Sequence, residues 1–496
     1  MNAPRTADPV TRPRPPFVQG APKELFIDGV WRPAASGRTL ETLDPMTEQV
    51  ITSIAAADAD DVDLAVRAAR RAFRSDEWSA LSPYRRGSLL LEIADVIEAH
   101  ADELATLDTL EMGGPLALTR WMVDHSVEVF RHYAGWPTKI YGQTAPSSPG
   151  QLNYVLKQPL GVVAAITPWN GPFLQMTWKV APALATGNTV VVKPAQQTSL
   201  STLRFAELLA ETGLPRGVVN VVTGTGGITG EALIQHLDVN KVTFTGSTAV
   251  GKHLLEASAG NLKRVTLELG GKSPTIVFAD ADLPAAARAA AADFLAGSGQ
   301  SCVAGTRIFV EESVRKEFSA LLADEMATYV PGDPFHPDTV MGPMASRDHY
   351  NKVLSYFTIA REAGAVITTG GTNDGDDGLF VAPTLIENVT NDMRVAQEEI
   401  FGPVAVLLPF SDVDEVVRMS NDSVYGLAAY VWTRDLSRAH TVAARLESGS
   451  VFINTTGQMS AGILPFGGVK QSGIGRDHGT DVIDAFTETK TVVVNL

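Results

Sequence analysis

The sequence has only one cysteine, Cys302, among its 496 residues. A single cysteine excludes an intramolecular disulfide, which fits a reducing compartment, so we expect a cytoplasmic protein. No stretch approaches the ~20 apolar residues of a membrane span, and no membrane association is expected. Basic residues are outnumbered, 40 Lys and Arg against 56 Asp and Glu, and the net charge of −16 disfavours nucleic acid as a partner.

The first twenty residues lack the apolar run of about 7–15 residues that a signal peptide needs. They are rich in Pro and Arg, and we expect residues 1–20 to form a flexible arm. The whole chain has an ordinary globular composition, with 45% apolar and 19% charged residues. Its length predicts two or three structural units.

Residue periodicity predicts the first elements. An Asp-Gly pair between apolar flanks predicts a β-hairpin over 25–31, and alternating apolar residues predict a strand over 151–157. Apolar residues at three- and four-residue spacing predict helices over 60–73, 83–100 and 116–136.

A regular series of short strands and helices comes next. Runs rich in β-branched residues cover 162–166, 189–192, 218–222 and 242–244. Because these runs are apolar without clean alternation, they predict a parallel sheet covered on both faces, as in nucleotide-binding α/β proteins. Ligands of such sheets lie beyond the carboxyl ends of the strands. The segments found there are 169–170, 193–196, 224–226 and 245–247.

Two turns at this edge are candidate phosphate sites. Gly224, Gly226 and Gly230 form a G-x-G-x-x-x-G pattern, which is one residue longer than the dinucleotide fingerprint and equally typical of a simple turn. The turn at 245–247 precedes a helix expected to begin near Thr248, whose free amides offer a phosphate site.

A second α/β section is predicted after residue 271. Its strands are expected over 275–278, 306–310, 405–408, 428–432 and 451–454. The acidic segment 373–378 lacks the ligand spacing of a calcium loop and is interpreted as a solvated turn, and we expect no metal site.

Three residues are candidates for catalysis. Cys302 follows an alanine-rich helix with Asp282 as its expected N-cap, in a break of small residues that leaves the thiol accessible to a carbonyl carbon; the alternative is a buried structural cysteine. Glu268 ends a strand and precedes two glycines, which suits a mobile general base or a merely solvated carboxylate. Asn170 offers an amide to an oxyanion, or caps a turn.

Seven motifs in order resemble the aldehyde dehydrogenase superfamily, and the resemblance runs from about Leu25 to the last strand. The motifs are Thr167-Pro168-Trp169-Asn170, Lys193-Pro194-Ala195, Phe244-Thr245-Gly246-Ser247, Leu267-Glu268-Leu269-Gly270-Gly271-Lys272-Ser273-Pro274, Gly299-Gln300-Ser301-Cys302, Glu398-Glu399-Ile400-Phe401-Gly402-Pro403 and Pro465-Phe466-Gly467-Gly468-Val469-Lys470-Gln471-Ser472-Gly473. The resemblance implies an α/β fold of three parts: a Rossmann-like NAD(P)-binding domain over 21–137 and 159–267, an α/β catalytic domain over 268–480, and a small β oligomerisation element over 138–158 and 481–496.

The resemblance also implies a reaction. Cys302 attacks the aldehyde carbon while the Asn170 amide and the backbone N–H of Cys302 hold the oxyanion. Hydride passes to the nicotinamide, and water activated by Glu268 hydrolyses the resulting thioester to the acid. The cofactor-binding residues implied by the family are Thr167, Pro168, Trp169, Lys193, Ala195, Gln196, Gly226, Phe244, Gly246, Ser247, Leu269, Gly270, Glu399 and Phe401. The implied substrate-binding residues are Gly171, Leu174, Trp178, Ser301, Thr455 and Phe466.

The sequence departs from the family pattern at three positions. Gln196 stands where many NAD-preferring relatives have Glu, which predicts that NAD is used and NADP is tolerated. Gly171 replaces an aromatic residue of relatives that oxidise small aldehydes, so we expect a bulky apolar or aromatic aldehyde. Asp477 replaces a Glu thought to help proton transfer, and that role is not carried over to it.

Other readings stay open at this point. A semialdehyde or coenzyme-A-acylating member of the superfamily is the alternative enzyme, and a structural relative without activity is the alternative of another class. By the resemblance, the last strand, 487–494, joins the 151–157 region in an oligomerisation sheet, so we expect a homodimer or homotetramer. Glu488 is a candidate partner of Arg264 and Arg476.

Overall fold

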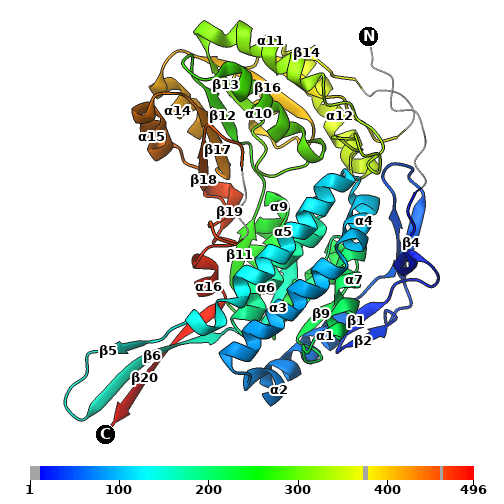
Figure 1. Cartoon of the computed structure of the whole chain (residues 1–496), viewed down its shortest axis with the longest axis vertical. Helices are drawn as coiled ribbons and strands as arrows, with labels where there is room; N and C mark the ends of the chain where they lie inside the picture. Colours follow the sequence, from blue (N-terminus) through cyan, green and yellow to red (C-terminus); the bar gives the residue numbers. More distant parts are fainter. Residues whose placement is uncertain (1–11, 373–377, 458–461) are drawn as a thin grey trace.

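The computed structural model describes residues 12–372, 378–457 and 462–496. Apart from Gly378, the acidic segment 373–378 lies outside the described residues. Figure 1 shows two α/β bodies one above the other and a β-ribbon that projects beside the lower one. None of the helices in the described parts is long and apolar enough to cross a membrane.

The lower body contains an eight-stranded sheet whose centre is parallel, as predicted. Its order is β19-β11-β10-β7-β8-β9-β1-β2. The strands are β1 (Leu25–Ile27), β2 (Val30–Arg32), β7 (Val162–Ile166), β8 (Thr189–Lys193), β9 (Val219–Val221), β10 (Lys241–Thr245), β11 (Arg264–Glu268) and β19 (Gly473–Ile474). The Asp-Gly hairpin is confirmed, since Asp28 and Gly29 both adopt the positive φ that this tight turn requires.

Helices cover both faces of this sheet. They are α1 (Ala59–Arg74), α2 (Asp76–Ser79), α3 (Pro83–Ala99), α4 (Ala101–Met112), α5 (Leu116–Ala134), α6 (Pro172–Ala185), α7 (Leu200–Leu208), α8 (Glu231–Gln235) and α9 (Thr248–Ala257). Val163 and Ala165 of β7 pack into the core formed with α3 to α7, whereas Val162 and Ala164 pack into the core formed with α1, α8 and α9. Both faces of β7 are therefore apolar, which explains the missing alternation.

The upper body contains a seven-stranded sheet in the order β14-β15-β16-β13-β12-β17-β18. The strands are β12 (Pro274–Val277), β13 (Arg307–Glu311), β14 (Val366–Thr369), β15 (Thr384–Glu387), β16 (Val404–Phe410), β17 (Ala428–Trp432) and β18 (Ser450–Ile453). The helices are α10 (Leu283–Leu295), α11 (Arg315–Met326), α12 (Arg347–Glu362), α13 (Arg394–Gln397), α14 (Val413–Asn421) and α15 (Leu436–Arg445). Asp282 caps α10 as expected, its side chain accepting the Ala285 N–H.

Some elements have no counterpart among the predictions. The hairpin β3 (Thr39–Leu43) and β4 (Val50–Ala55), the helix α4, the edge strand β14 and its neighbour β15 were not foreseen. The predicted domain boundaries stay predictions. One element crosses them in the sheets: β19 pairs with β11 in the lower body although it belongs to the predicted 268–480 unit.

The projecting ribbon is a three-stranded sheet in the order β20-β6-β5. Its strands are β5 (Gln143–Ala145), β6 (Gln151–Pro159) and β20 (Thr487–Asn495), and β20 follows the short helix α16 (Asp481–Ala485). β20 runs antiparallel to β6 over its full length. Glu488 accepts hydrogen bonds from Arg264, as expected, whereas Arg476 donates to the carbonyl oxygens of Gly468 and Gly475.

The described part of the predicted N-terminal arm is anchored to the body rather than free. In residues 12–20, Val18 is buried in the large core beneath α3 to α7. Arg12 forms an ion pair with Asp333 at 2.8 Å. The burial of Val18 and the ion pair of Arg12 hold this segment in place. Neither contact can be predicted from the amino-acid composition of the segment.

Candidate functional site

The loop that carries Cys302 is shaped by residues with left-handed backbone conformation. After α10 ends, Gly297, Ser298 and Gly299 have φ values of 55°, 61° and 71°. A Cβ at Gly299 would collide with the backbone of Gly402, so the loop packs where only glycine fits. The turn leaves Cys302 partly exposed before β13 begins.

A second glycine pair holds the floor of the site. A Cβ at Gly271 would collide with the carbonyl oxygen of Cys302, and one at Gly270 would collide with the Glu399 carboxylate. The Gly271 N–H donates to Glu399 Oε1 at 3.0 Å. The link between β11 and β12 therefore lies directly between the cysteine loop and Glu399.

Asn170 lies beside the cysteine loop from the other side. Its Nδ2 donates to the carbonyl oxygen of Gln300 at 2.9 Å, and its Oδ1 accepts from Gln175 at 3.3 Å. These two hydrogen bonds hold the Asn170 amide against Gln300, which lies two residues before Cys302 in the cysteine loop.

Glu268 is buried at the end of β11, and neither carboxyl oxygen has a hydrogen-bond partner among the described residues. Burial, and next the charge of Asp477, raise the pKa of Glu268 well above its ordinary value, while Lys179 and Arg476 act in the opposite direction. Lys179 and Asp477 form a buried ion pair at 3.0 Å. Glu268 therefore holds a proton over a wider pH range than an ordinary carboxyl group.

The Cys302 thiol is also shifted. Burial raises its pKa to about 12, and the negative charges of Glu268 and Glu399 act in the same direction. The backbone N–H groups of Cys302 and Val303 oppose the shift. With this pKa, Cys302 is a thiol rather than a thiolate at neutral pH.

A pocket of about 220 Å³ opens next to Cys302. Its lining residues are Pro168, Trp169, Asn170, Thr245, Gly246, Ser247, Leu269, Gly270, Cys302, His349, Lys352, Glu399 and Phe401. Eight of the predicted cofactor-binding residues and two of the predicted catalytic residues thus meet in one cavity. The chemistry of the lining residues suits a dinucleotide, because the pocket combines the N-terminus of α9 at Ser247 and the Lys352 cation with the Glu399 carboxylate and with the Thr245 hydroxyl, which has no partner among the described residues.

Sequence reasoning missed two pocket residues, His349 and Lys352, which come from α12. His349 Nε2 lies 2.6 Å from the carbonyl oxygen of Phe401, and its ring centroid lies 5.1 Å from that of Trp169. Burial lowers the pKa of His349 to about 4, so the ring is neutral at pH 7. No motif marks α12, and only the tertiary contact with Phe401 reveals it.

The other predicted cofactor residues lie around the pocket rather than in its lining. They are Thr167, Lys193, Ala195, Gln196, Gly226 and Phe244. The Thr167 N–H donates to the Lys193 carbonyl, which joins the ends of β7 and β8. Lys193 is buried, which lowers its pKa to about 8, whereas Gln196 is exposed. The Phe244 ring packs beneath Gly246.

Three of the predicted substrate residues, Gly171, Leu174 and Trp178, lie in α6 or at its N-cap. A Cβ at Gly171 would lie 3.9 Å from Met122 of α5, so this position is close to the neighbouring helix. Leu174 and Trp178 follow on α6, and the Trp178 ring packs edge-on against Phe466 at 5.2 Å. Ser301 precedes the cysteine, and the Thr455 hydroxyl donates to the Thr456 carbonyl. Residues 458–461, which follow shortly after Thr455, lie outside the described residues.

Comparison with known proteins agrees with this geometry. A sequence profile of the Aldehyde dehydrogenase family matches residues 31–492. The chain belongs to the aldehyde dehydrogenase family. An aldehyde dehydrogenase of Alternaria alternata is 43% identical over 477 residues, which are 96% of each protein.

Two solved aldehyde dehydrogenase structures show the same fold. One is AldA of P. syringae, an indole-3-acetaldehyde dehydrogenase solved as a cysteine-to-alanine mutant with NAD+ and IAA. It is 41% identical to this chain, with a TM-score of 0.94, and the match covers 96% of this chain and 97% of that chain. An NAD+ complex of a Bacillus cereus aldehyde dehydrogenase is 44% identical, with a TM-score of 0.94 over 96% and 97%. The predicted aldehyde dehydrogenase fold is therefore confirmed.

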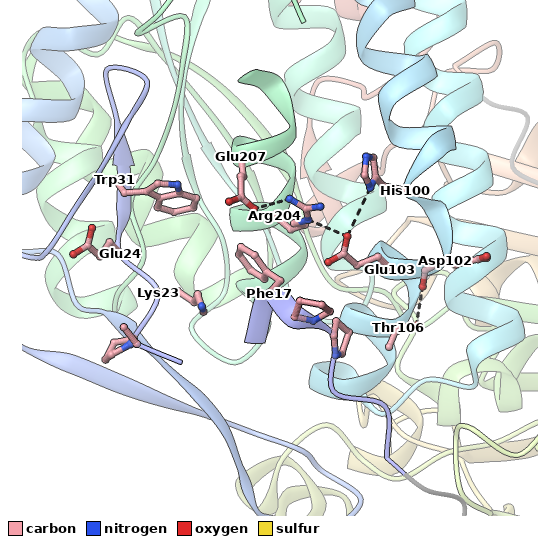
Figure 2. A pocket seen from close by; sticks show the side chains of 14 residues that line it. Phe17, Lys23, Glu24, Trp31, His100, Asp102, Glu103, Thr106, Arg204 and Glu207 are labelled. Atoms are coloured by element: carbon pink, nitrogen blue, oxygen red, sulfur yellow. Dashed lines mark hydrogen bonds and ion pairs between the residues drawn. The ribbon is translucent and has the colours of Figure 1, made fainter. Parts of the chain in front are cut away.

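A larger cavity in the described residues of this aldehyde dehydrogenase lies elsewhere. It measures about 910 Å³ and is lined by the N-terminal segment, α4 and α7. Figure 2 shows Phe17 and Trp31 in it beside Arg204, whose guanidinium pairs with Glu103 and Glu207. None of the predicted site residues lines this cavity, so size alone does not locate the active site.

The raised pKa of Cys302 predicts its reactivity in the free enzyme. Alkylation by iodoacetamide, followed by mass spectrometry, is expected to accelerate about tenfold per pH unit up to about pH 10 without a plateau, because only the thiolate reacts. A cysteine-containing model peptide, whose pKa is about 8.5, serves as the control. A plateau below pH 9 for the protein would contradict the electrostatic description of the site.

Proposed function

We propose that this enzyme oxidises a bulky apolar or aromatic aldehyde to the carboxylic acid with NAD+, through a thioester on Cys302. The observation that carries the proposal is the shared pocket, in which Cys302 lies with Asn170, Glu399 and Phe401. A nucleophile, an amide donor and a dinucleotide cradle thus have one cavity in common, and the acid-base group Glu268 lies buried next to it.

In the proposed reaction Cys302 Sγ forms a bond to the aldehyde carbon as the thiol proton passes to Glu268, which returns it to solvent before the hydrolysis step. The carbonyl oxygen becomes an oxyanion, which the Asn170 Nδ2 and the Cys302 N–H stabilise. NAD+ bound in the pocket supplies the acceptor for the hydride that leaves this carbon. Water then attacks the thioester carbon, Glu268 takes one proton from that water, and the acid departs as the C–S bond breaks.

The raised pKa of Glu268 supports its proposed role. A general base works best when its pKa lies near the working pH, since it must both accept a proton and lose it again. Asn170 is held by Gln300 and Gln175, so its amide needs little reorganisation as the oxyanion forms.

The aromatic pair Trp178 and Phe466 supports the substrate class. Gly171 leaves space next to Met122 where a larger side chain would narrow the approach. The similar P. syringae enzyme is named for indole-3-acetaldehyde, which is an aromatic aldehyde.

An aldehyde panel read by NADH absorbance tests the proposed function. Benzaldehyde is expected to exceed succinic semialdehyde in kcat/KM by about tenfold, the scale of one aromatic contact of ~1.4 kcal/mol. Cys302→Ala is expected to remove NADH formation, while Ser437→Ala, at an exposed serine of α15, retains it.

Each alternative has its own outcome in this assay. A preference for succinic semialdehyde would assign a semialdehyde dehydrogenase, and formation of acyl-coenzyme A when coenzyme A is added would assign an acylating enzyme. Wild-type inactivity across the whole panel would assign a non-catalytic relative.

NAD+ is the proposed cofactor, with NADP+ tolerated, because the exposed Gln196 adds no negative charge near Lys193. Gln196→Glu is expected to raise the NAD+ preference in kcat/KM about tenfold, since one like-charge repulsion near the surface is worth ~1 kcal/mol or more. The neighbouring Gln197→Glu is the matched control. Absence of any NADP+ turnover by the wild type would contradict the proposal.

We also propose a homodimer or homotetramer joined through the projecting sheet. The outer edge of β20 has no strand beside it in the described structure, and Val493 is 62% exposed there. A working compartment that keeps Cys302 reduced, such as the cytoplasm, is part of the same proposal.

Val493→Asp is expected to shift the enzyme towards monomer in light scattering, because a charge opposes burial at a subunit contact. Leu237→Asp, at an equally exposed leucine outside this sheet, is the control. An unchanged mass for Val493→Asp, or a monomeric wild type, would contradict assembly through this edge.

A further inference from the structure

The backbone turn that carries Cys302 is held on both sides of the cysteine. Before it, the Asn170 amide binds the carbonyl oxygen of Gln300 at 2.9 Å. The turn is closed by the Ala304 N–H, which donates to the carbonyl oxygen of Ser301 at 3.3 Å. Cys302 and the residue after it are therefore the two central residues of a tight turn.

Two side chains bind the backbone directly after Cys302. The Tyr430 hydroxyl, from β17, donates to the carbonyl oxygen of Val303 at 3.0 Å. The Gly305 N–H donates to Asp293 Oδ2, from α10, at 2.6 Å. A strand and a helix of the second body thus each supply one polar group to the same short segment.

Gly305 is enclosed by the side chains around it. A Cβ at this position would lie 3.0 Å from Asp293 Oδ2 and 3.1 Å from Tyr430 Cδ2, and it would collide with the Thr275 hydroxyl. Only glycine fits among these three side chains, so the backbone can approach Asp293 and Tyr430 closely.

Tyr430 is itself held firmly. It is 1% exposed, and its ring stacks on that of Phe452 from β18, with centroids 5.4 Å apart and an angle of 18° between the planes. Burial, followed by the charge of Asp293, raises the pKa of Tyr430 well above its ordinary value. The hydroxyl therefore keeps its proton and remains a hydrogen-bond donor.

Asp293 serves as an acceptor in either protonation state. Loss of hydration raises the pKa of Asp293 to about 7, against the hydrogen bonds with the Gly305 N–H and Tyr430. A carboxylate and a carboxylic acid both keep an oxygen that accepts an N–H, and so does the carbonyl of an asparagine.

We propose that Tyr430 and Asp293 position Cys302 for attack by holding the Val303 carbonyl and the Gly305 N–H. The inference rests on the proposed function, in which Cys302 Sγ attacks the aldehyde carbon while the Cys302 N–H stabilises the oxyanion. Both atoms belong to one residue, so their direction follows the backbone that the two side chains hold. A small displacement of that backbone lowers the rate of attack. Neither side chain contacts the aldehyde in this proposal, so both are positioning residues.

Tyr430→Phe tests the hold on Val303, because it removes the hydroxyl and keeps the ring stacked on Phe452. With NAD+ and benzaldehyde, kcat is expected to fall about tenfold, which corresponds to one hydrogen bond of ~1.4 kcal/mol. KM for benzaldehyde and NAD+ affinity measured by fluorescence should both stay within about twofold of the wild type. Tyr329→Phe, at a tyrosine that packs against the same core as α10, is the matched control.

Asp293 allows a rescue test. Asp293→Ala removes the acceptor of the Gly305 N–H and is expected to lower kcat about tenfold. Asp293→Asn keeps a carbonyl acceptor and should retain most of the wild-type rate. Tyr430→Phe combined with Asp293→Ala should lose less than the product of the two single losses, because both residues hold the same turn.

Alkylation of Cys302 by iodoacetamide separates the position of the thiol from its reactivity. This reagent reacts with the thiolate and forms no oxyanion, so its rate at fixed pH should change less than about twofold in Tyr430→Phe and Asp293→Ala. A lower kcat with unchanged alkylation is the result expected for a displaced but intact thiol.

A wild-type kcat in Tyr430→Phe would overturn the proposal. So would an Asp293→Asn variant as slow as Asp293→Ala. A change in alkylation rate as large as the change in kcat would also overturn it, since that pattern reports an altered thiol or an unfolded loop. Inactivity of the wild type on every aldehyde would instead overturn the proposed function, so the two failures are distinguishable.

Discussion

The close approach of the Gly271 backbone to the Cys302 carbonyl is the constraint on which the rest of the site depends. No side chain fits between these two segments, and the Gly271 N–H at the same point binds Glu399. One glycine therefore brings together the segment after β11, the cysteine loop that follows α10 and the Glu399 carboxylate.

Burial is the second determinant of the chemistry. It raises the pKa of both Cys302 and Glu268, so the protonated forms of the two groups are favoured together. The two members of the buried Lys179–Asp477 ion pair have opposite effects on Glu268. The Lys179 cation lowers the pKa of Glu268, and the Asp477 anion raises it. A small movement of Lys179 or Asp477 would therefore change the pKa of Glu268.

Parallel topology explains why residues from distant parts of the chain meet. The carboxyl ends of β7, β10 and β11 lie at one edge of the first sheet, so the loops after these three strands share a pocket. Glu399 and Phe401 reach the same pocket from the second sheet, just before β16. Phe401 adopts a positive φ of 63°, and its carbonyl oxygen lies 2.6 Å from His349 Nε2.

The amino-acid sequence by itself determined the parallel strands, the cap of α10 and the set of motifs that includes Cys302, Glu268 and Asn170. These features are local: β-branched runs, a capping aspartate and short ordered patterns are visible without knowledge of the fold. Only the tertiary structure decided that α12 contributes His349 and Lys352, that Val18 anchors the N-terminal segment, and that the His478 ring lies next to Trp178. Such contacts join segments far apart in the chain, and the burial that shifts their pKa values exists only once the segments are packed together.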